Sequence, residues 1–248
     1  MIVDPGIGMI GRYCRFMYLV MGQPEKWGVF GRRILQETYK LGVDSLGIVT
    51  LISFFVGAVV TIQLANNLDN PFIPTYTIGF AARETIVLEF SSTIVCLILA
   101  GKVGSNISSE IGTMRITEQI DALDIMGINS AAYLAAPKVV AMVVSVPLLV
   151  MYSMCVGIIG GWVSGFMTGM VPSDEFIRGL HFMFKPYYIF YSIFKSSLFA
   201  FIIASVSSFF GYYVHGGALD VGRASTKSVV VSCVMVLMVN LIVTQLLL

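Results

Sequence analysis

Residues 45–68, SLGIVTLISFFVGAVVTIQLANNL, decide the fold of this chain, and no charged side chain interrupts them between Asp44 and Asp69. A helix rises about 1.5 Å per residue, so roughly 20 apolar residues cross the hydrocarbon core of a bilayer. The run is long enough for one crossing. It therefore predicts a transmembrane helix.

The composition of the whole chain supports a membrane protein. The 248 residues include 15 Lys plus Arg and 14 Asp plus Glu, 57% are hydrophobic, and the mean hydropathy is +0.87. A soluble domain needs more polar surface than this to cover its core. The net charge of +1 excludes a nucleic-acid binder, and four widely spaced cysteines exclude a disulfide scaffold or zinc ribbon.

Four further apolar runs complete a set of five predicted spans in an all-α integral membrane protein. The second span has to accept Glu89, and the third is too long for one straight crossing. That third run is expected to hold one long helix, with Pro147 as a candidate kink, plus part of the next loop. The runs are residues 85–101, 139–173, 196–219 and 228–248.

The distribution of Lys and Arg predicts the orientation of these spans. With the N-terminus inside, segments 1–44, 102–138 and 220–227 are cytoplasmic and carry eleven basic residues, whereas the outer loops 69–84 and 171–195 carry four. Basic residues concentrate on the cytoplasmic side of membrane proteins. We therefore predict the N-terminus inside and the C-terminus outside. No cleavable signal peptide is recognisable in the first residues.

The segment before the first span has an amphipathic pattern. Apolar residues recur at helical spacing from Trp27 to Val43, while most of the charged residues fall elsewhere on the helical wheel. This pattern favours a helix lying in the inner membrane interface, although an ordinary cytoplasmic helix remains open. Residues 1–44 are thus expected to form an N-terminal interfacial segment, and residues 45–248 a single transmembrane domain.

The loop between spans two and three predicts a cytoplasmic amphipathic helix over about residues 105–126, closed by Gly127. One face of its helical wheel is apolar and a neighbouring arc is acidic. Such a helix either docks into a groove on a partner protein or packs on its own spans as a connector. The apolar residues are Ile116, Ile120 and Leu123, and the acidic ones are Glu110, Glu118, Asp121 and Asp124.

Three segments of this chain resemble a known family. Residues 110–123, EIGTMRITEQIDAL, closely resemble the signature of the MlaE family, and residues 100–105 and 216–227 are similar to further family segments. Two positions depart from the usual pattern. Many members have Arg-Glu-Leu-Gly-Pro where residues 88–92 read LEFSS, and many have an acidic residue where this chain has Asn240.

The resemblance implies a permease subunit of an ABC transporter that works with MCE-domain proteins. It implies a homodimer with two ATPase subunits, moving phospholipid or a similar lipid between the inner and outer membranes of a Gram-negative cell by alternating access. The chain has no Walker motif, so ATP and Mg²⁺ are expected on the ATPase, with no cofactor and no enzymatic activity here. The expected ATPase-coupling residues are Glu110, Met114, Arg115, Glu118, Gln119, Asp121 and Leu123.

Two charges inside the predicted spans are the candidate substrate site. A lone charge within the bilayer costs at least about 2.5 kcal/mol, so Glu89 and Lys195 should each face a partner or a wet cavity. The resemblance places such residues near a lipid pocket. Alternatively, Lys195 extends to the outer headgroups and Glu89 caps a helical turn. Apolar neighbours from the first span are expected at Phe54, Phe55 and Leu64.

Glycines recur every four residues along the third span, a pattern typical of close helix packing. Whether they pack within one subunit or across a dimer is open at this stage. No metal site is expected, because His181 and His215 have no ligand-like spacing. Besides the transporter we consider a non-catalytic scaffold or channel, and an intramembrane lipid enzyme that would lack a nucleophile–base set. The glycines are Gly157, Gly161, Gly165 and Gly169.

Overall fold

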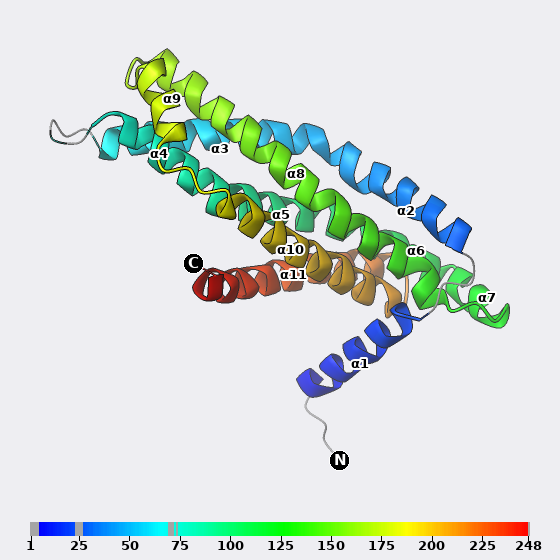
Figure 1. Cartoon of the computed structure of the whole chain (residues 1–248). Coiled ribbons are helices and arrows are strands. Elements are labelled where there is room, and N and C mark those ends of the chain that lie inside the picture. The colour runs from blue at the N-terminus through cyan, green and yellow to red at the C-terminus, as the bar shows by residue number, and fades with distance from the viewer. Residues whose placement is uncertain (1–4, 23–26, 69–71, 73, 248) are drawn as a thin grey trace. The chain divides into compact units, whose positions relative to one another are not determined.

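A computed structural model describes residues 5–22, 27–68, 72 and 74–247. Within these ranges the chain is helical and has no strand (Figure 1). Five helical runs are long and apolar enough to cross a membrane, which confirms the predicted all-α membrane fold and its five spans. They cover Gly28–Asn67, Tyr76–Ile116, Ser130–Thr168, Tyr187–Tyr212 and Ala218–Leu247.

The first two spans extend beyond their apolar runs. Helix α2 (Trp27–Gly42) confirms the predicted amphipathic helix, and a short 3₁₀ turn joins it to α3 (Leu46–Asn67). Span two runs without a break from α4 through η2, α5 and η3 into α6, so the predicted loop after residue 101 begins as helix. These elements are α4 (Tyr76–Thr85), η2 (Ile86–Ile94), α5 (Val95–Leu99), η3 (Ala100–Gly104) and α6 (Ser105–Ile116).

The later spans also begin before their apolar runs. Helix α8 (Ser130–Thr168) is preceded by Asn129, whose side-chain oxygen accepts the Ala132 backbone N–H at 3.2 Å as a helix N-cap. The short α9 (Ser173–His181) follows, and then α10 (Tyr187–Tyr212) and α11 (Ala218–Leu247). Hydropathy locates the apolar middle of a helix, whereas capping and tertiary contacts set its ends.

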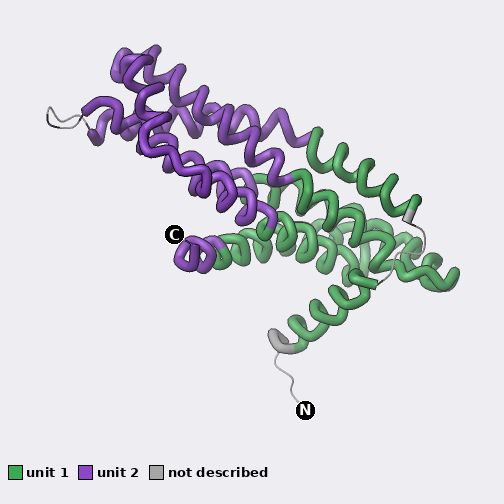
Figure 2. Tube along the Cα trace, viewed as in Figure 1, with its two compact units in different colours: residues 1–43, 97–145, 198–239 green, residues 44–96, 146–197, 240–248 purple. Residues whose placement is uncertain are grey.

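The described chain divides into two compact units (Figure 2), with residues of α8, α10 and α11 in both. Unit 1 comprises residues 1–43, 97–145 and 198–239, and it contains α1 (Pro5–Val20), which the sequence analysis missed. Phe16 of α1 is fully buried against Ala131 and Phe209, and the Tyr13 hydroxyl lies 2.7 Å from Ser205 Oγ. The four-residue spacing of Phe16 and Val20 was the available signal.

Unit 2 comprises residues 44–96, 146–197 and 240–248, and in it α3 packs closely on α8 at several glycines. A Cβ added to Gly57 would overlap the Gly157 carbonyl, and one on Gly161 would overlap the Thr61 hydroxyl. The glycine stripe therefore packs within one chain, at least at Gly157 and Gly161. At Gly165 the added Cβ would meet Val171 at 3.5 Å, an ordinary contact.

One predicted member of the stripe lies beyond the end of α8. Gly169 follows the last residue of α8, has a φ of +67°, and would bring an added Cβ near no other atom. Glycine adopts this left-handed conformation without steric cost and commonly terminates helices. Gly169 thus ends the helix instead of packing it, because the helical repeat stops one residue earlier.

Candidate functional site

Glu89 lies on a widened stretch of span two. The segment η2 (Ile86–Ile94) is a π-helix, and such segments inside α-helices are frequent at functional sites. Ser92 Oγ lies 3.3 Å from the carbonyl oxygens of both Leu88 and Glu89, so it supplies a donor within the widened turn. This local geometry occupies the place where many family members have Gly-Pro.

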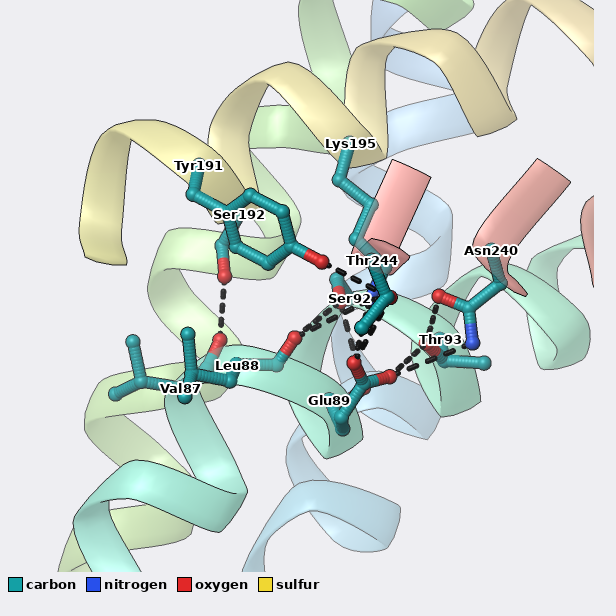
Figure 3. Close-up of polar contacts among 10 residues, drawn as sticks. All are labelled: Val87, Leu88, Glu89, Ser92, Thr93, Tyr191, Ser192, Lys195, Asn240 and Thr244. Carbon is teal, nitrogen blue, oxygen red and sulfur yellow. Dashed lines mark hydrogen bonds and ion pairs between the residues drawn. The ribbon is translucent and has the colours of Figure 1, made fainter. Parts of the chain in front are cut away.

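The two charges predicted inside the membrane form an ion pair (Figure 3). Lys195 Nζ of α10 lies 2.9 Å from Glu89 Oε1. The ammonium also donates to the Leu88 carbonyl at 3.3 Å and to Thr244 Oγ1 at 3.4 Å. The Lys195 side chain is 0% exposed, whereas that of Glu89 is 40% exposed. Lys195 therefore points into unit 2 toward Glu89, which contradicts the alternative that it extends to the headgroups.

Polar side chains of α11 complete the cluster around Glu89. Asn240 Nδ2 donates to Glu89 Oε2 at 3.4 Å, and the Thr244 hydroxyl donates to Oε1 at 3.3 Å. Thr93, one turn after Glu89, donates to Oε2 at 3.3 Å. Asn240 is neutral, so the cluster holds one carboxylate and one ammonium, and it carries no net charge. The departure at Asn240 thus supplies a neutral donor to Glu89.

The sequence predicts the two charged residues but not the polar residues around them. Thr93 and Thr244 were not predicted at this site, and neither was Tyr191, whose hydroxyl lies 3.0 Å from Thr244 Oγ1. Asn240 and Thr244 stand four residues apart in an apolar run, and that spacing places both on one helical face. A search for polar residues at helical spacing within the last span would have identified them.

The three apolar residues expected beside the pair make other contacts. Leu64 packs against a cluster that contains Ala65 and Phe176. The rings of Phe54 and Phe55 contact each other edge to face, with centroids 5.8 Å apart. Their part in a substrate pocket stays a prediction.

A second polar cluster in unit 1 joins α2, α6 and α8. Lys138 of α8 is 3% exposed and lies 2.7 Å from Glu37 Oε1 and 3.0 Å from Glu110 Oε1. Lys40 of α2 pairs with the other Glu110 oxygen at 2.7 Å. Glu110 was predicted on the acidic arc of the helix over residues 105–126, called here the coupling segment, and it ties the start of this segment to two neighbouring helices.

The coupling segment is two helices where the sequence predicts one. Helix α6 ends at Ile116, Glu118 adopts a left-handed conformation with a φ of 60°, and α7 covers Gln119–Ile125. Arg115 and Asp121 form an ion pair of 2.7 Å across the break. A helical wheel drawn over 105–126 misplaced the acidic arc because the helix changes direction at residues 117–118.

The other predicted coupling residues divide between buried and open positions. Ile120 is fully buried, and Ile116 and Leu123 are half-buried. Gln119 is exposed and donates to the Thr117 hydroxyl at 3.0 Å, and Met114 lines a polar cavity of about 180 Å³ beside Lys138. Sequence reasoning missed the most open apolar residue of α7, Ile125, which is 87% exposed.

Within the described ranges, no three His, Cys, Asp or Glu side chains are grouped so that they could hold a metal ion. A helical membrane protein with buried ion pairs such as those of Lys195 and Lys138 is compatible with several transport families, and comparison with known proteins decides among them.

The family model described as Permease MlaE matches residues 34–246. The chain belongs to the MlaE permease family. Its relatives include a probable ABC transporter permease protein of Rickettsia prowazekii, 30% identical over 96% of this chain and 91% of the relative. A second, from Synechocystis, is 31% identical over 91% of this chain and 83% of the relative. This MlaE permease is thus a multi-pass transmembrane permease of an ABC transporter.

A plant relative extends the family beyond bacteria. The chloroplastic protein TRIGALACTOSYLDIACYLGLYCEROL 1 of Arabidopsis thaliana is 29% identical over 89% of this chain and 63% of its own length. Membership of an ABC transporter family implies an ATPase partner for the MlaE permease. The match begins at residue 34, inside α2, so it covers all five spans and both polar clusters apart from the N-terminal part of α2.

Proposed function

We propose that this MlaE permease moves a phospholipid or similar amphiphile through a homodimer, driven by ATP hydrolysis on separate ATPase subunits. The observation that carries the proposal is the unequal burial of the ion pair. Lys195 is enclosed, but the Glu89 side chain remains 40% exposed in the middle of an apolar span. A carboxylate facing hydrocarbon is costly. Glu89 therefore faces a wet cavity, into which a lipid headgroup fits, or a second copy of the chain.

The ATPase side of the proposal rests on the coupling segment. Helix α7 ends at Ile125, which is 87% exposed, and Met126 directly after it is 64% exposed; both follow the Arg115–Asp121 ion pair. Exposed apolar residues beside charged ones are the usual composition of a helix that docks into a groove. Movement of an ATPase groove would pull α7, and α6 would pass that movement to α2 and α8 through Glu110, Lys40 and Lys138.

The remaining parts of the proposal concern topology and partners. The segments on the same side of the membrane as the N-terminus carry eleven basic residues, and those on the opposite side carry four. This difference supports a cytoplasmic N-terminus and an outer C-terminus. The inner membrane of a Gram-negative cell, an MCE-domain partner on the outer side and the absence of a cofactor on this chain follow from the family resemblance. The Arabidopsis relative is named after a galactolipid, which supports a lipid cargo.

The test is photo-crosslinking in native membranes that contain the complete complex. A benzophenone amino acid replaces Thr93, which shares the face of Glu89 and leaves the Glu89–Lys195 pair in place. The matched control replaces Leu241, which neighbours Asn240 on α11 and is 67% exposed. We expect Thr93 to crosslink phospholipid only while the ATPase turns over, and this crosslink to weaken when Glu89→Gln is added.

Three outcomes would overturn the proposal. Crosslinks from position 93 that match those from position 241 would mean that Glu89 faces bulk lipid. Lipid transfer that persists when the ATPase is inactive would favour a channel. A complex without any ATPase subunit after purification in mild detergent would favour a scaffold.

Charge reversal at Glu118 and Asp121 together should release the ATPase or uncouple its activity from lipid, and normal coupling would contradict the role of α7.

A further inference from the structure

A second cavity lies in unit 1, where α10 is connected to α11. Its volume is about 310 Å³, at the lower end of the range of roughly 300–1,000 Å³ that small-molecule sites occupy. The lining comes from α1, the end of α10, the connecting residues and the first turns of α11. The lining includes Arg12, Phe209, Phe210, Asp220, Arg223 and Lys227.

The charges around this cavity favour an anion. Arg12, Arg223 and Lys227 line it together with one carboxylate, that of Asp220. Asp220 is already engaged, because its Oδ2 accepts the Gly217 backbone N–H at 3.1 Å and its Oδ1 lies 3.5 Å from Arg223. Arg223 and Lys227 are four residues apart on α11 and so project from the same face. The cavity thus has an excess of two positive charges over negative ones.

The floor of the cavity is aromatic and belongs to a spanning helix. Phe209 and Phe210 lie in the last turn of α10, and their ring centroids are 5.5 Å apart. The Lys227 ammonium lies 5.7 Å from the centre of the Phe210 ring. The same turn of α10 ends at Tyr212, and Tyr213, which follows it, lines the cavity; tyrosines at the end of a transmembrane helix mark the level of the headgroups. The basic side chains therefore stand where the phosphates of one membrane leaflet lie.

We propose that this cavity binds the phosphate group of an anionic phospholipid from the adjacent leaflet. Basic cavities between transmembrane helices at the membrane surface are suited to anionic headgroups, which the aromatic floor and the basic rim would hold together. The volume accommodates a headgroup but leaves the acyl chains outside, along α10 and α11. The site is separate from Glu89 and does not depend on which cargo the permease carries.

Native mass spectrometry of the permease, purified with its ATPase partner, measures the affinity of the first bound lipid. We expect phosphatidylglycerol to bind more tightly than phosphatidylcholine. Each basic residue near an anionic headgroup contributes about 1 kcal/mol, or about fivefold in affinity. The double variant Arg223→Gln/Lys227→Gln should therefore bind phosphatidylglycerol about 25-fold more weakly, while Arg223→Lys/Lys227→Arg should keep most of the affinity.

The chain contains a closely matched control pair in unit 2. Arg178 pairs with an acidic residue three positions earlier at 3.7 Å, and Lys185 lies 5.7 Å from the centre of the Tyr188 ring. The variant Arg178→Gln/Lys185→Gln removes the same two charges from the same kinds of contact, but outside the cavity. We expect its affinity for phosphatidylglycerol to equal that of the unmodified protein.

Each remaining outcome overturns the proposal. Equal weakening in the control would mean that lipids respond to net charge alone. An unchanged affinity in Arg223→Gln/Lys227→Gln, or equal binding of both lipids, would show that the cavity takes no anionic headgroup. Inorganic phosphate provides the last arm. If it displaces phosphatidylglycerol at low millimolar concentration and raises the melting temperature only when Arg223 and Lys227 are present, the ligand is a free anion instead.

Discussion

Glu89 and Lys195 form an ion pair, but replacing Glu89 should destabilise the protein more than replacing Lys195. In Glu89→Gln the Lys195 ammonium keeps the Leu88 carbonyl and the Thr244 hydroxyl, but it loses its counter-charge while it stays fully buried. Removing one partner of a buried ion pair costs about 3–5 kcal/mol. We expect a value near the lower end, about 3 kcal/mol, because Glu89 is partly open.

Replacing Lys195 instead leaves the Glu89 carboxylate without its counter-charge, but this carboxylate has more hydrogen bonds than the Lys195 ammonium would keep. In Lys195→Met the Glu89 carboxylate keeps its hydrogen bonds from Thr93, Asn240 and Thr244, and its open side admits water. We expect a smaller loss of about 1–2 kcal/mol. The double variant Glu89→Gln/Lys195→Met strands no charge and should recover most of the stability, since neutral replacement of a buried pair is often tolerated.

Thermal unfolding in mild detergent, followed by the loss of helical circular dichroism, measures these differences. For a chain of this size 1 kcal/mol corresponds to about 2–4 °C. Glu89→Gln should therefore melt about 6–12 °C lower than the unmodified protein, and Lys195→Met about 2–8 °C lower. The control is Glu175→Gln, which breaks an exposed pair with Arg178 and should change stability by less than about 1 kcal/mol.

Specific results would refute this reasoning. If Glu89→Gln has the same melting temperature as the unmodified protein, the ion pair does not contribute to stability. If Lys195→Met is the more harmful change, the burial asymmetry has been assigned to the wrong partner. If the losses of the two single variants simply add in the double variant, the two side chains do not interact, because residues in contact normally show coupling of about 0.5–3 kcal/mol.

Two other changes test packing and the second cluster. Gly57→Ala should abolish folded protein or lower its melting temperature strongly, because the new methyl group would overlap backbone atoms of α8. The control Gly47→Ala lies on the same helix, where the new methyl group meets no atom, and it should express normally. Equal yields of both variants would contradict the close contact. Lys138→Met leaves Glu37 and Glu110 without their shared buried cation and should lower the free energy of unfolding by about 3 kcal/mol in the same melting assay. Lys138→Arg keeps the charge and should lower it less. A Lys138→Met protein as stable as the unmodified one would mean that these helices do not need the charge.

The break between α6 and α7 could not be predicted from the spacing of residues in the sequence. Residues 110–123 carried enough information to suggest the family, and the family match over residues 34–246 confirmed it. The same residues did not reveal that Glu118 is left-handed, since a non-glycine residue rarely adopts that conformation without support from its surroundings. The Arg115–Asp121 pair provides such support, and its six-residue spacing belongs to no regular helix.

Hydropathy is a local property that can be summed along the chain, so the sequence alone determined the five spans, the amphipathic α2 and the presence of two charges that need partners. Only the tertiary structure decided that Lys195 reaches Glu89, that Asn240 donates to the same carboxylate, and that Gly57 lies against Gly157. Each of these contacts depends on the register between helices distant in the sequence. Side-chain packing and hydrogen bonding across the helices set that register, and neither can be summed along a single helix.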